Sequence, residues 1–228
     1  MPQNNFINFE FNQPEKIRMQ QKRIVLLITL LALITSFILL SLFIVDHPIP
    51  TLDHKISLFV QKYHSDSLDK IMLGVSFFGE LPYSLLMVVL VAMLFYHFKY
   101  KREAYFTLSI LLSGLLILGI KNIIDRPRPT AFYVRLVEIN RFQSYPSGHV
   151  LSYVLFFGFM IFLMRKLNHL PLITRRIVTY FSAFFIATIA FSRIYLGAHW
   201  FSDTLGGFLL GLICLYPLCF FYLKKKRG

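Results

Sequence analysis

The feature that most constrains this chain is the apolar run 24–45, which contains no charged side chain. About 20 such residues are needed for a helix to cross the hydrocarbon core of a bilayer. Further apolar runs follow at about 81–98, 104–120, 149–164, 177–196 and 204–223. Backbone groups in lipid must be hydrogen-bonded within their own segment, which a helix achieves. The sequence therefore predicts an all-α polytopic membrane protein with six transmembrane helices.

The composition agrees with one membrane domain. Only 15% of the 228 residues are charged and 56% are hydrophobic, whereas about 25% of the residues are charged in a soluble protein. We expect a membrane domain over 24–223, with cytoplasmic tails at 1–23 and 224–228. A cleaved signal peptide is the alternative for 24–45, but the run is long and no small-residue cleavage site follows it. Cys214 and Cys219 lie in the last run and are interpreted as small apolar residues.

Residues 46–80, between spans one and two, have a mixed character. The stretches "LDHKISLFVQKY" and "SLDKIMLGVSFFG" combine helical apolar spacing with charged side chains. Such segments are typical of helices that lie in the membrane interface. We therefore expect short interfacial helices here.

Lysine and arginine residues predict the orientation of the spans. Four lie in the N-terminal tail, three between spans two and three, four between spans four and five, and four at the C-terminal end, so 15 of the 24 fall on one side. That side should be cytoplasmic, with both termini inside. The net charge of +13 is spread in short tracts between apolar runs, so we expect no nucleic-acid partner.

Several cations lie on the outer side, contrary to the tendency of lysine and arginine to lie on the cytoplasmic side. Anchoring to lipid headgroups is one explanation, and it suffices for Arg135 and Arg141. Binding of an anion is the other. The outer cations are Lys121, Arg126, Arg128, Arg135, Arg141 and Arg193.

Three segments with chemically active residues should meet on the outer side. The first, "KNIIDRPRP", ends span three, and its prolines should stop the helix and hold Arg128 in an extended segment. The second, "YPSGH", begins span four, where free backbone N–H groups and the helix dipole favour an anion. In the third, "SRIYLGAHWFSD", His199 and Asp203 are four residues apart and share a face if span six already begins there.

Together these segments bring two histidines, a carboxylate and three cations to one membrane face. This set suits phosphoryl transfer, because fixed cations stabilise a transition state that spreads negative charge over three oxygens. Each part has a simpler interpretation alone: a structural histidine, a common helix pair or a stiff basic turn. Convergence of all three by chance is improbable. Asp125 and Glu138 are interpreted as loop residues.

The three segments carry a family resemblance. Lys121 to Pro129 (K-x6-R-P), Pro146 to His149 (P-S-G-H) and Ser192 to Asp203 (S-R-x5-H-x3-D) match the motifs of the type 2 phosphatidic acid phosphatase superfamily in order and spacing. The chain resembles this family over about 50–223. It is most similar to the membrane-bound bacterial branch, which includes phosphatidylglycerophosphate and undecaprenyl pyrophosphate phosphatases.

The resemblance implies a role for each motif residue. His199 would attack phosphorus and form a phosphohistidine, Asp203 would orient His199, and His149 would be the general acid and then the base. The remaining residues would bind the phosphate oxygens: Lys121, Arg128, Arg193, Ser147 and Gly148. The family needs no metal or other cofactor. The chain agrees with this, because the site has too few carboxylates for a two-metal centre.

Three functions are open at this point. The first is a lipid phosphatase that faces the periplasm or exterior, acting on undecaprenyl pyrophosphate, phosphatidylglycerophosphate or lipid A. The second is a phosphotransferase that passes phosphate from undecaprenyl pyrophosphate to an acceptor such as lipid A. The third is a non-catalytic transporter or scaffold. The short chain without further domains favours a bacterial plasma-membrane enzyme, and the oligomeric state stays open.

Overall fold

The computed structural model describes residues 13–140 and 142–224, and the regular elements in those residues are all helices. In chain order they are α1 (Gln13–Asp46), α2 (Thr51–Gln61), α3 (Asp66–Ser76), η1 (Phe77–Gly79), α4 (Leu81–His97), α5 (Lys101–Ser109), η2 (Ile110–Leu112), α6 (Ser113–Ile124), α7 (Gly148–Lys166), α8 (Leu172–Tyr195) and α9 (Phe201–Leu223). Most of the predicted N-terminal tail, 1–12, and the end of the C-terminal tail, 225–228, lie outside the described residues.

The helices confirm the predicted all-α membrane fold. Five stretches are long and apolar enough to cross a membrane: Arg23–Asp46, Lys101–Ile124, Gly148–Lys166, Leu172–Tyr195 and Phe201–Leu223. A sixth stretch is long and apolar enough only as a bent pair, Asp66–Gly79 with Leu81–His97, in which α4 follows α3 and η1 after a bend of 57°. Large side chains on the outer surface of α1 are well exposed, such as Ile28 at 60% and Leu39 at 61%, as expected for a surface covered by lipid.

Helix α7 lies in the middle of the bundle, packed against α8 and α9, while α1 packs mainly on α9. Aromatic residues of α7 form the core, including Tyr153, Phe156 and Phe157, which are almost completely buried. Gly207 and Gly211 of α9 face α7, where an added Cβ would meet Ser147 and Val154. The G-x-x-x-G sequence therefore serves close helix packing within the chain.

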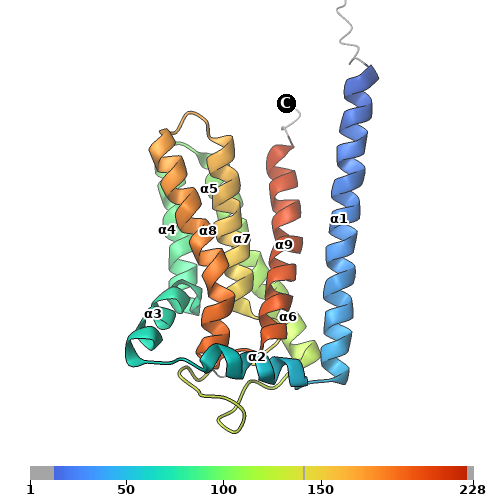
Figure 1. The fold of residues 1–228 in the computed structure, drawn as a ribbon. Coiled ribbons are helices and arrows are strands. Elements are labelled where there is room, and N and C mark those ends of the chain that lie inside the picture. The colour runs from blue at the N-terminus through green and yellow to red at the C-terminus, as the bar shows by residue number, and fades with distance from the viewer. Residues whose placement is uncertain (1–12, 141, 225–228) are drawn as a thin grey trace, which may run out of the picture.

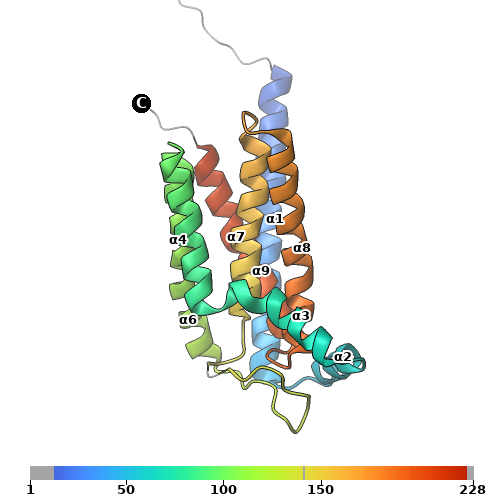
Figure 2. The same ribbon diagram turned by 90° about the vertical axis from the view of Figure 1, so that its left-hand side faces the viewer.

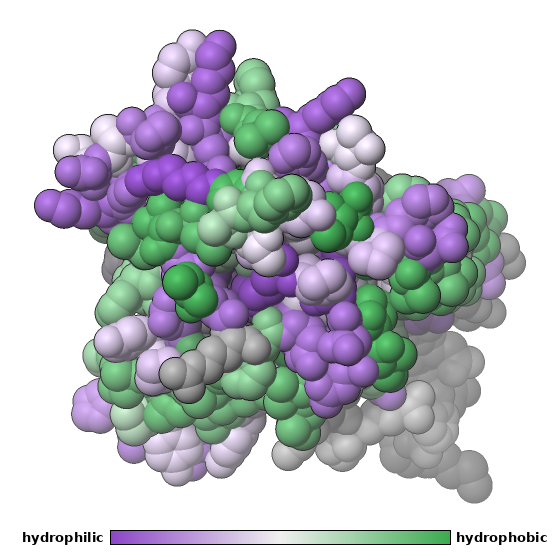
Figure 3. All heavy atoms as spheres, turned by 90° about the horizontal axis from the view of Figure 1, so that it is seen from below, coloured by the Kyte–Doolittle hydropathy of each residue, from purple (hydrophilic) through white to green (hydrophobic). Residues whose placement is uncertain are grey.

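The predicted outer segments gather at one end of the bundle. Helices α2 and α3 and the connection from α6 to α7 lie at this end, whereas α1 begins and α9 ends at the opposite end (Figures 1 and 2). Seen from below, hydrophilic side chains gather on this end between hydrophobic ones (Figure 3). The topology thus brings the three motif segments together, as the six-span arrangement predicts.

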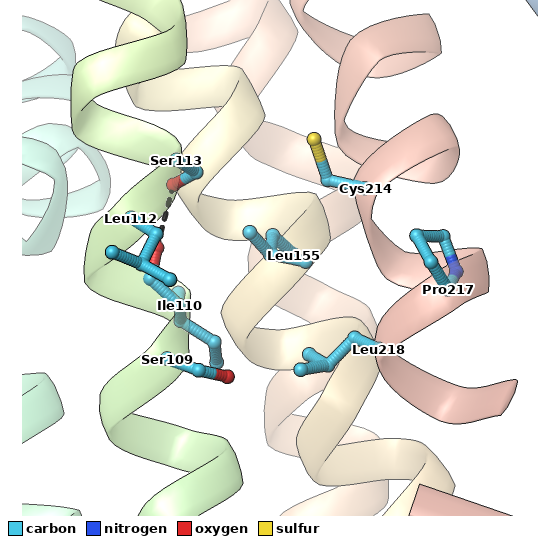
Figure 4. A pocket seen from close by; sticks show the side chains of 8 residues that line it. All are labelled: Ser109, Ile110, Leu112, Ser113, Leu155, Cys214, Pro217 and Leu218. Carbon is cyan, nitrogen blue, oxygen red and sulfur yellow. Dashed lines mark hydrogen bonds between the residues drawn. The ribbon is translucent and has the colours of Figure 1, made fainter. Parts of the chain in front are cut away.

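An apolar cavity of about 190 Å³ lies away from this end, between the α5–η2–α6 segment, α7 and α9. Figure 4 shows its lining, which includes Leu155 of α7 and Pro217 and Leu218 of α9. The short 3₁₀ turn η2 interrupts the third span beside this cavity. No motif residue lines this cavity.

Candidate active site

The start of α7 is built as predicted. Ser147 is the N-cap and Gly148 the first helical residue. The Ser147 N–H donates to the carbonyl of Asp203 at 3.0 Å, which fixes the start of α7 beside α9. The Ser147 Oγ and His149 Nε2 atoms are buried and have no hydrogen-bond partner among the described residues. Both are therefore free to bond a ligand at this helix start.

Lys121 and the "RPRP" stretch follow from the end of α6. The helix ends at Ile124, before either proline, and Asp125 closes it in a left-handed conformation with φ of 45°. The prolines then keep the chain extended rather than ending the helix themselves. Lys121 is buried in the last turn, and its Nζ donates to the carbonyls of Gln143 and Ser144.

Arg193 comes from the last turn of α8 and is fully buried. Its carbonyl accepts the N–H groups of Ala198 and His199 at 3.1 and 3.2 Å, while Gly197 adopts φ of 70°. This is a glycine-closed helix end, in which a side chain at Gly197 would strike the Arg135 carbonyl. The turn places His199 directly beside the helix that carries Arg193.

His199 and Asp203 meet, but not on a shared helix face. Helix α9 begins at Phe201, so His199 lies in the preceding turn and Asp203 in the first turn. The His199 Nδ1 atom is 3.4 Å from Asp203 Oδ2. The same oxygen accepts the Ser144 hydroxyl at 2.5 Å and the Trp200 N–H at 2.8 Å. Asp203 is thus held from several sides while it faces the ring.

Arg128 completes the surroundings of His199. Its Nη1 lies 3.3 Å from His199 Nε2 and 2.6 Å from the Ala198 carbonyl. Because a guanidinium only donates, this contact assigns the lone pair to Nε2 and the proton to Nδ1. Burial, then Arg128, Arg193 and Lys121, hold the pKa of His199 well below its usual value of 6.5. Burial lowers the pKa of Arg128 to about 10, so the guanidinium stays charged beside a neutral imidazole.

The structure gives partners to two residues of the outer loop. Glu138 lies in this loop as predicted, and its two carboxylate oxygens accept from Arg193 Nη1 and Nη2, both at 2.7 Å. Burial raises the pKa of Glu138, but these bonds to Arg193 outweigh it and the net shift is downward. Arg135 needs no lipid headgroup, because its guanidinium is paired with Asp69. Arg141 lies outside the described residues.

One set of donors has the spacing of a metal site. Ligand atoms of Glu80, Glu138 and His149 lie within 4.8 Å of one another. Glu138 is already bonded to Arg193, and the cations Arg128 and Lys121 add positive charge beside His149. These charges oppose a divalent cation and favour an anion.

Comparison with known proteins agrees with this geometry. The sequence profile of the PAP2 superfamily matches residues 102–227. Phosphatidylglycerophosphatase B of Bacillus subtilis is 30% identical over 204 residues, which cover 86% of this chain and 96% of that protein. The chain belongs to the PAP2 superfamily. It is a membrane phosphatase of the PAP2 type.

One further relative and two solved structures are also similar to this chain. Lipid phosphate phosphatase delta of Arabidopsis thaliana is 25% identical over 164 residues, which cover 68% of this chain and 39% of that protein. The crystal structure of the transmembrane PAP2-type phosphatidylglycerolphosphate phosphatase from Bacillus subtilis superposes with a TM-score of 0.76 at 22% identity, covering 87% of this chain and 98% of that one. Aquifex aeolicus LpxE gives a TM-score of 0.58 at 22% identity, over 78% and 99% of the two chains. Both structures share the fold.

Several residues that contact the candidate active site were not identified from the sequence. Ser144 bonds Asp203, and Arg126, noted only as an outer cation, bonds both Asp203 and Asp53 of α2. The extended "RPRP" stretch offered one signal for Arg126. In an extended chain, residues two apart point to the same face, so Arg126 should lie on the same face as the motif residue Arg128. For Asp53, the chain offers no local signal of its distant partners.

Proposed function

We propose that this PAP2 phosphatase hydrolyses the phosphate of a membrane lipid through a phosphohistidine on His199, at the outer face of the membrane. The supporting observation concerns unpartnered polar atoms. The described residues contain four buried side-chain nitrogen or oxygen atoms without a partner, and three of them are Ser147 Oγ, His149 Nε2 and Arg193 Nε. Buried polar atoms are rarely left unsatisfied. Their concentration in the proposed phosphate site supports a ligand there.

The three cations would clamp the phosphate. Each is bonded to acceptors of the protein itself: Lys121 to carbonyl groups, Arg128 to His199 and three carbonyls, and Arg193 to Glu138. Phosphate oxygens offer stronger, charge-assisted bonds in place of these. The Ser147 hydroxyl and the Gly148 N–H at the start of α7 would add neutral donors.

The reaction would run in two steps. The lone pair of His199 Nε2 attacks phosphorus, the bond from phosphorus to the lipid oxygen breaks, and His149 gives that oxygen a proton. Water then attacks the phosphorus, His149 takes a proton from it, and the N–P bond breaks to release phosphate. Asp203 would keep the Nδ1 proton in place and stabilise the positive ring of the intermediate.

A lipid substrate is supported by the surroundings of the site. The apolar cavity begins at Leu155, six residues along α7 from His149 (Figure 4), or about 9 Å at 1.5 Å per residue. An acyl or isoprenoid chain has the chemistry to fill such a space. Phosphatidylglycerophosphate is the leading substrate, since the 30% identical relative is a phosphatidylglycerophosphatase, and undecaprenyl pyrophosphate is second.

The orientation belongs to the same proposal. The segments that carry the excess of lysine and arginine adjoin the start of α1, the α4–α5 and α7–α8 connections and the end of α9, which lie opposite the motif segments (Figure 1). The positive-inside tendency then puts both termini in the cytoplasm of a bacterial plasma membrane and the site outside. A membrane-impermeant thiol reagent, applied to intact cells carrying a single cysteine at Phe132, should label the protein, whereas a cysteine at Lys224 should not react.

The deciding experiment is phosphate release from phosphatidylglycerophosphate by purified protein in detergent, with EDTA present. Wild-type protein should release phosphate and His199→Ala should not. His97→Ala is the matched control, because His97 is exposed at the last turn of α4, and it should keep wild-type rates. The same assay with undecaprenyl pyrophosphate ranks the two substrates. Full activity of His199→Ala would refute the proposed nucleophile.

A further inference from the structure

Arg126 binds two carboxylates at once, deep inside the protein. Its side chain has no exposed surface. Nη2 lies 2.6 Å from Asp53 Oδ2, and Nη1 lies 2.5 Å from Asp203 Oδ1. Nε donates to the carbonyl of Pro48 at 2.8 Å. Three charges are thus buried together, and their sum is one negative charge.

Asp53 connects α2 to the first turn of α9. It is only 1% exposed, and its Oδ1 accepts the backbone N–H of Ser202 at 2.9 Å. The hydroxyl of Ser202 donates to Asp53 Oδ2 and accepts from Arg126 Nη1 at 2.7 Å. Ser202 directly precedes Asp203, so Asp53 and Arg126 hold both the backbone and the side chain beside His199.

The network divides the two oxygens of Asp203 between different tasks. Oδ1 accepts from Arg126, while Oδ2 faces His199 Nδ1. This fixes the rotation of the carboxylate about its side-chain bond. A single arginine paired only with Asp203 would cancel its charge. The second carboxylate, Asp53, leaves the group net negative, which favours a positive imidazole ring.

We propose that Asp53 and Arg126 are positioning residues for the phosphohistidine step, and that both act on His199 through Asp203. This inference rests on the proposed function. When Nε2 of His199 bonds to phosphorus, its lone pair becomes the new bond, the leaving oxygen takes the bonding electrons, and the ring becomes positive with its Nδ1 proton retained. The negative group of Asp53, Arg126 and Asp203 stabilises that ring and keeps the proton directed at Asp203.

A purely structural role is the competing explanation, because Asp53 also fastens α2 to α9. The chain provides a matched control in Asp69 and Arg135. This pair likewise joins an interfacial helix, α3, to the segment between α6 and α7, with Nη1 2.9 Å from Oδ1. Asp69 also accepts the Tyr195 hydroxyl at 2.7 Å. The described contacts of this pair do not include His199 or Asp203.

The test measures kcat, KM and the inhibition constant of inorganic phosphate for Asp53→Asn, Arg126→Lys, Arg126→Ala and Asp69→Asn. Loss of the aspartate that orients a catalytic histidine costs about 10⁴ in kcat, so loss of its partner should cost between about tenfold and a hundredfold. KM and the phosphate inhibition constant should stay within about threefold, because neither residue touches the phosphate clamp. Arg126→Lys should recover part of the activity lost in Arg126→Ala, and Asp69→Asn should keep wild-type kcat.

Thermal unfolding of each purified variant reports whether it folds. Should Asp53→Asn fail to fold, the two Arg126 variants test the inference instead: kcat should fall in Arg126→Ala and recover in part in Arg126→Lys. Wild-type kcat in Asp53→Asn or Arg126→Ala would overturn the inference. So would an equal loss in Asp69→Asn, or a phosphate inhibition constant that rises as far as kcat falls.

Wild type and His199→Ala are measured in the same series, which separates the two proposals. Absence of phosphate release by wild type, or retained release by His199→Ala, would refute the proposed function. If those two proteins behave as proposed and Asp53→Asn turns over at the wild-type rate, only the positioning role is wrong.

Discussion

Replacing Gly207 with alanine would place a methyl group between α9 and the start of α7. Its Cβ would lie 2.5 Å from the Ser147 carbonyl oxygen and 3.1 Å from Val150 Cβ. Ordinary contacts of this kind begin at 3.4 Å, so the two helices must separate by about 0.9 Å at this level. The obstacle at Ser147 is backbone, which cannot rotate out of the way as a side chain does.

The expected result follows from that displacement. His149 belongs to α7 and Ser147 is its N-cap, whereas Asp203 belongs to α9, so the shift moves the proposed acid away from the proposed nucleophile. A misplacement of about 1 Å can cost about a hundredfold in rate. The overpacked contact should also cost roughly 1–3 kcal/mol of folding stability.

The assay is kcat for phosphate release, measured with thermal unfolding of the same samples. Gly114→Ala is the matched control, because Gly114 lies within α6 and an added Cβ has no neighbour within 4 Å. That variant should keep wild-type kcat and unfold at the wild-type temperature or slightly above it. Wild-type kcat in Gly207→Ala would refute the claim that the α7–α9 distance sets the geometry of the site.

Three further outcomes are expected. Arg128→Ala should lower kcat by about a hundredfold or more, as for loss of one oxyanion donor, and a loss below fivefold would contradict its role. Because the pKa of His199 is held well below 6.5, its ring is neutral at neutral pH. Protonation of His199 should therefore lower kcat/KM only well below pH 6.5. A decline of kcat/KM that depends on His199 and is centred at pH 6.5 would contradict the lowered pKa. Glu138→Gln should tighten inhibition by inorganic phosphate about tenfold or more, because it weakens the carboxylate that competes with phosphate for Arg193. The same change should lower the unfolding temperature. Unchanged inhibition would show that Glu138 does not compete with phosphate for Arg193.

Much of the site followed from the order of residues along the chain. The "YPSGH" stretch carries its own helix start, so Ser147 and Gly148 were placed correctly at the beginning of α7. The apolar runs set the number of spans, and an even alternation of spans puts all three motifs at one end. Helix starts depend on local residue preferences, and spans depend on the thickness of the bilayer. Both leave a direct pattern in the sequence.

What the sequence could not predict depends on contacts between distant residues. The Asp53–Ser202 bond joins residues on α2 and α9, and the Glu138–Arg193 pair depends on how the loop folds over α8. His199 was expected to share a helix with Asp203 if α9 began early. The turn closed by Gly197 instead delays α9 to Phe201. Such details follow from packing rather than from periodicity.

Helix α2 shows an unusual division of its surface. Its buried side chains are the polar Asp53, Ser57 and Gln61, while Leu52 is 61% and Phe59 78% exposed. In water this arrangement would be inside out, since Leu52 and Phe59 face away from the protein. At a bilayer interface it is satisfied on both sides. The lipid headgroup region thus acts as a further structural layer of the enzyme. A detergent must replace that layer if the network of Asp53, Arg126 and Asp203 is to stay assembled.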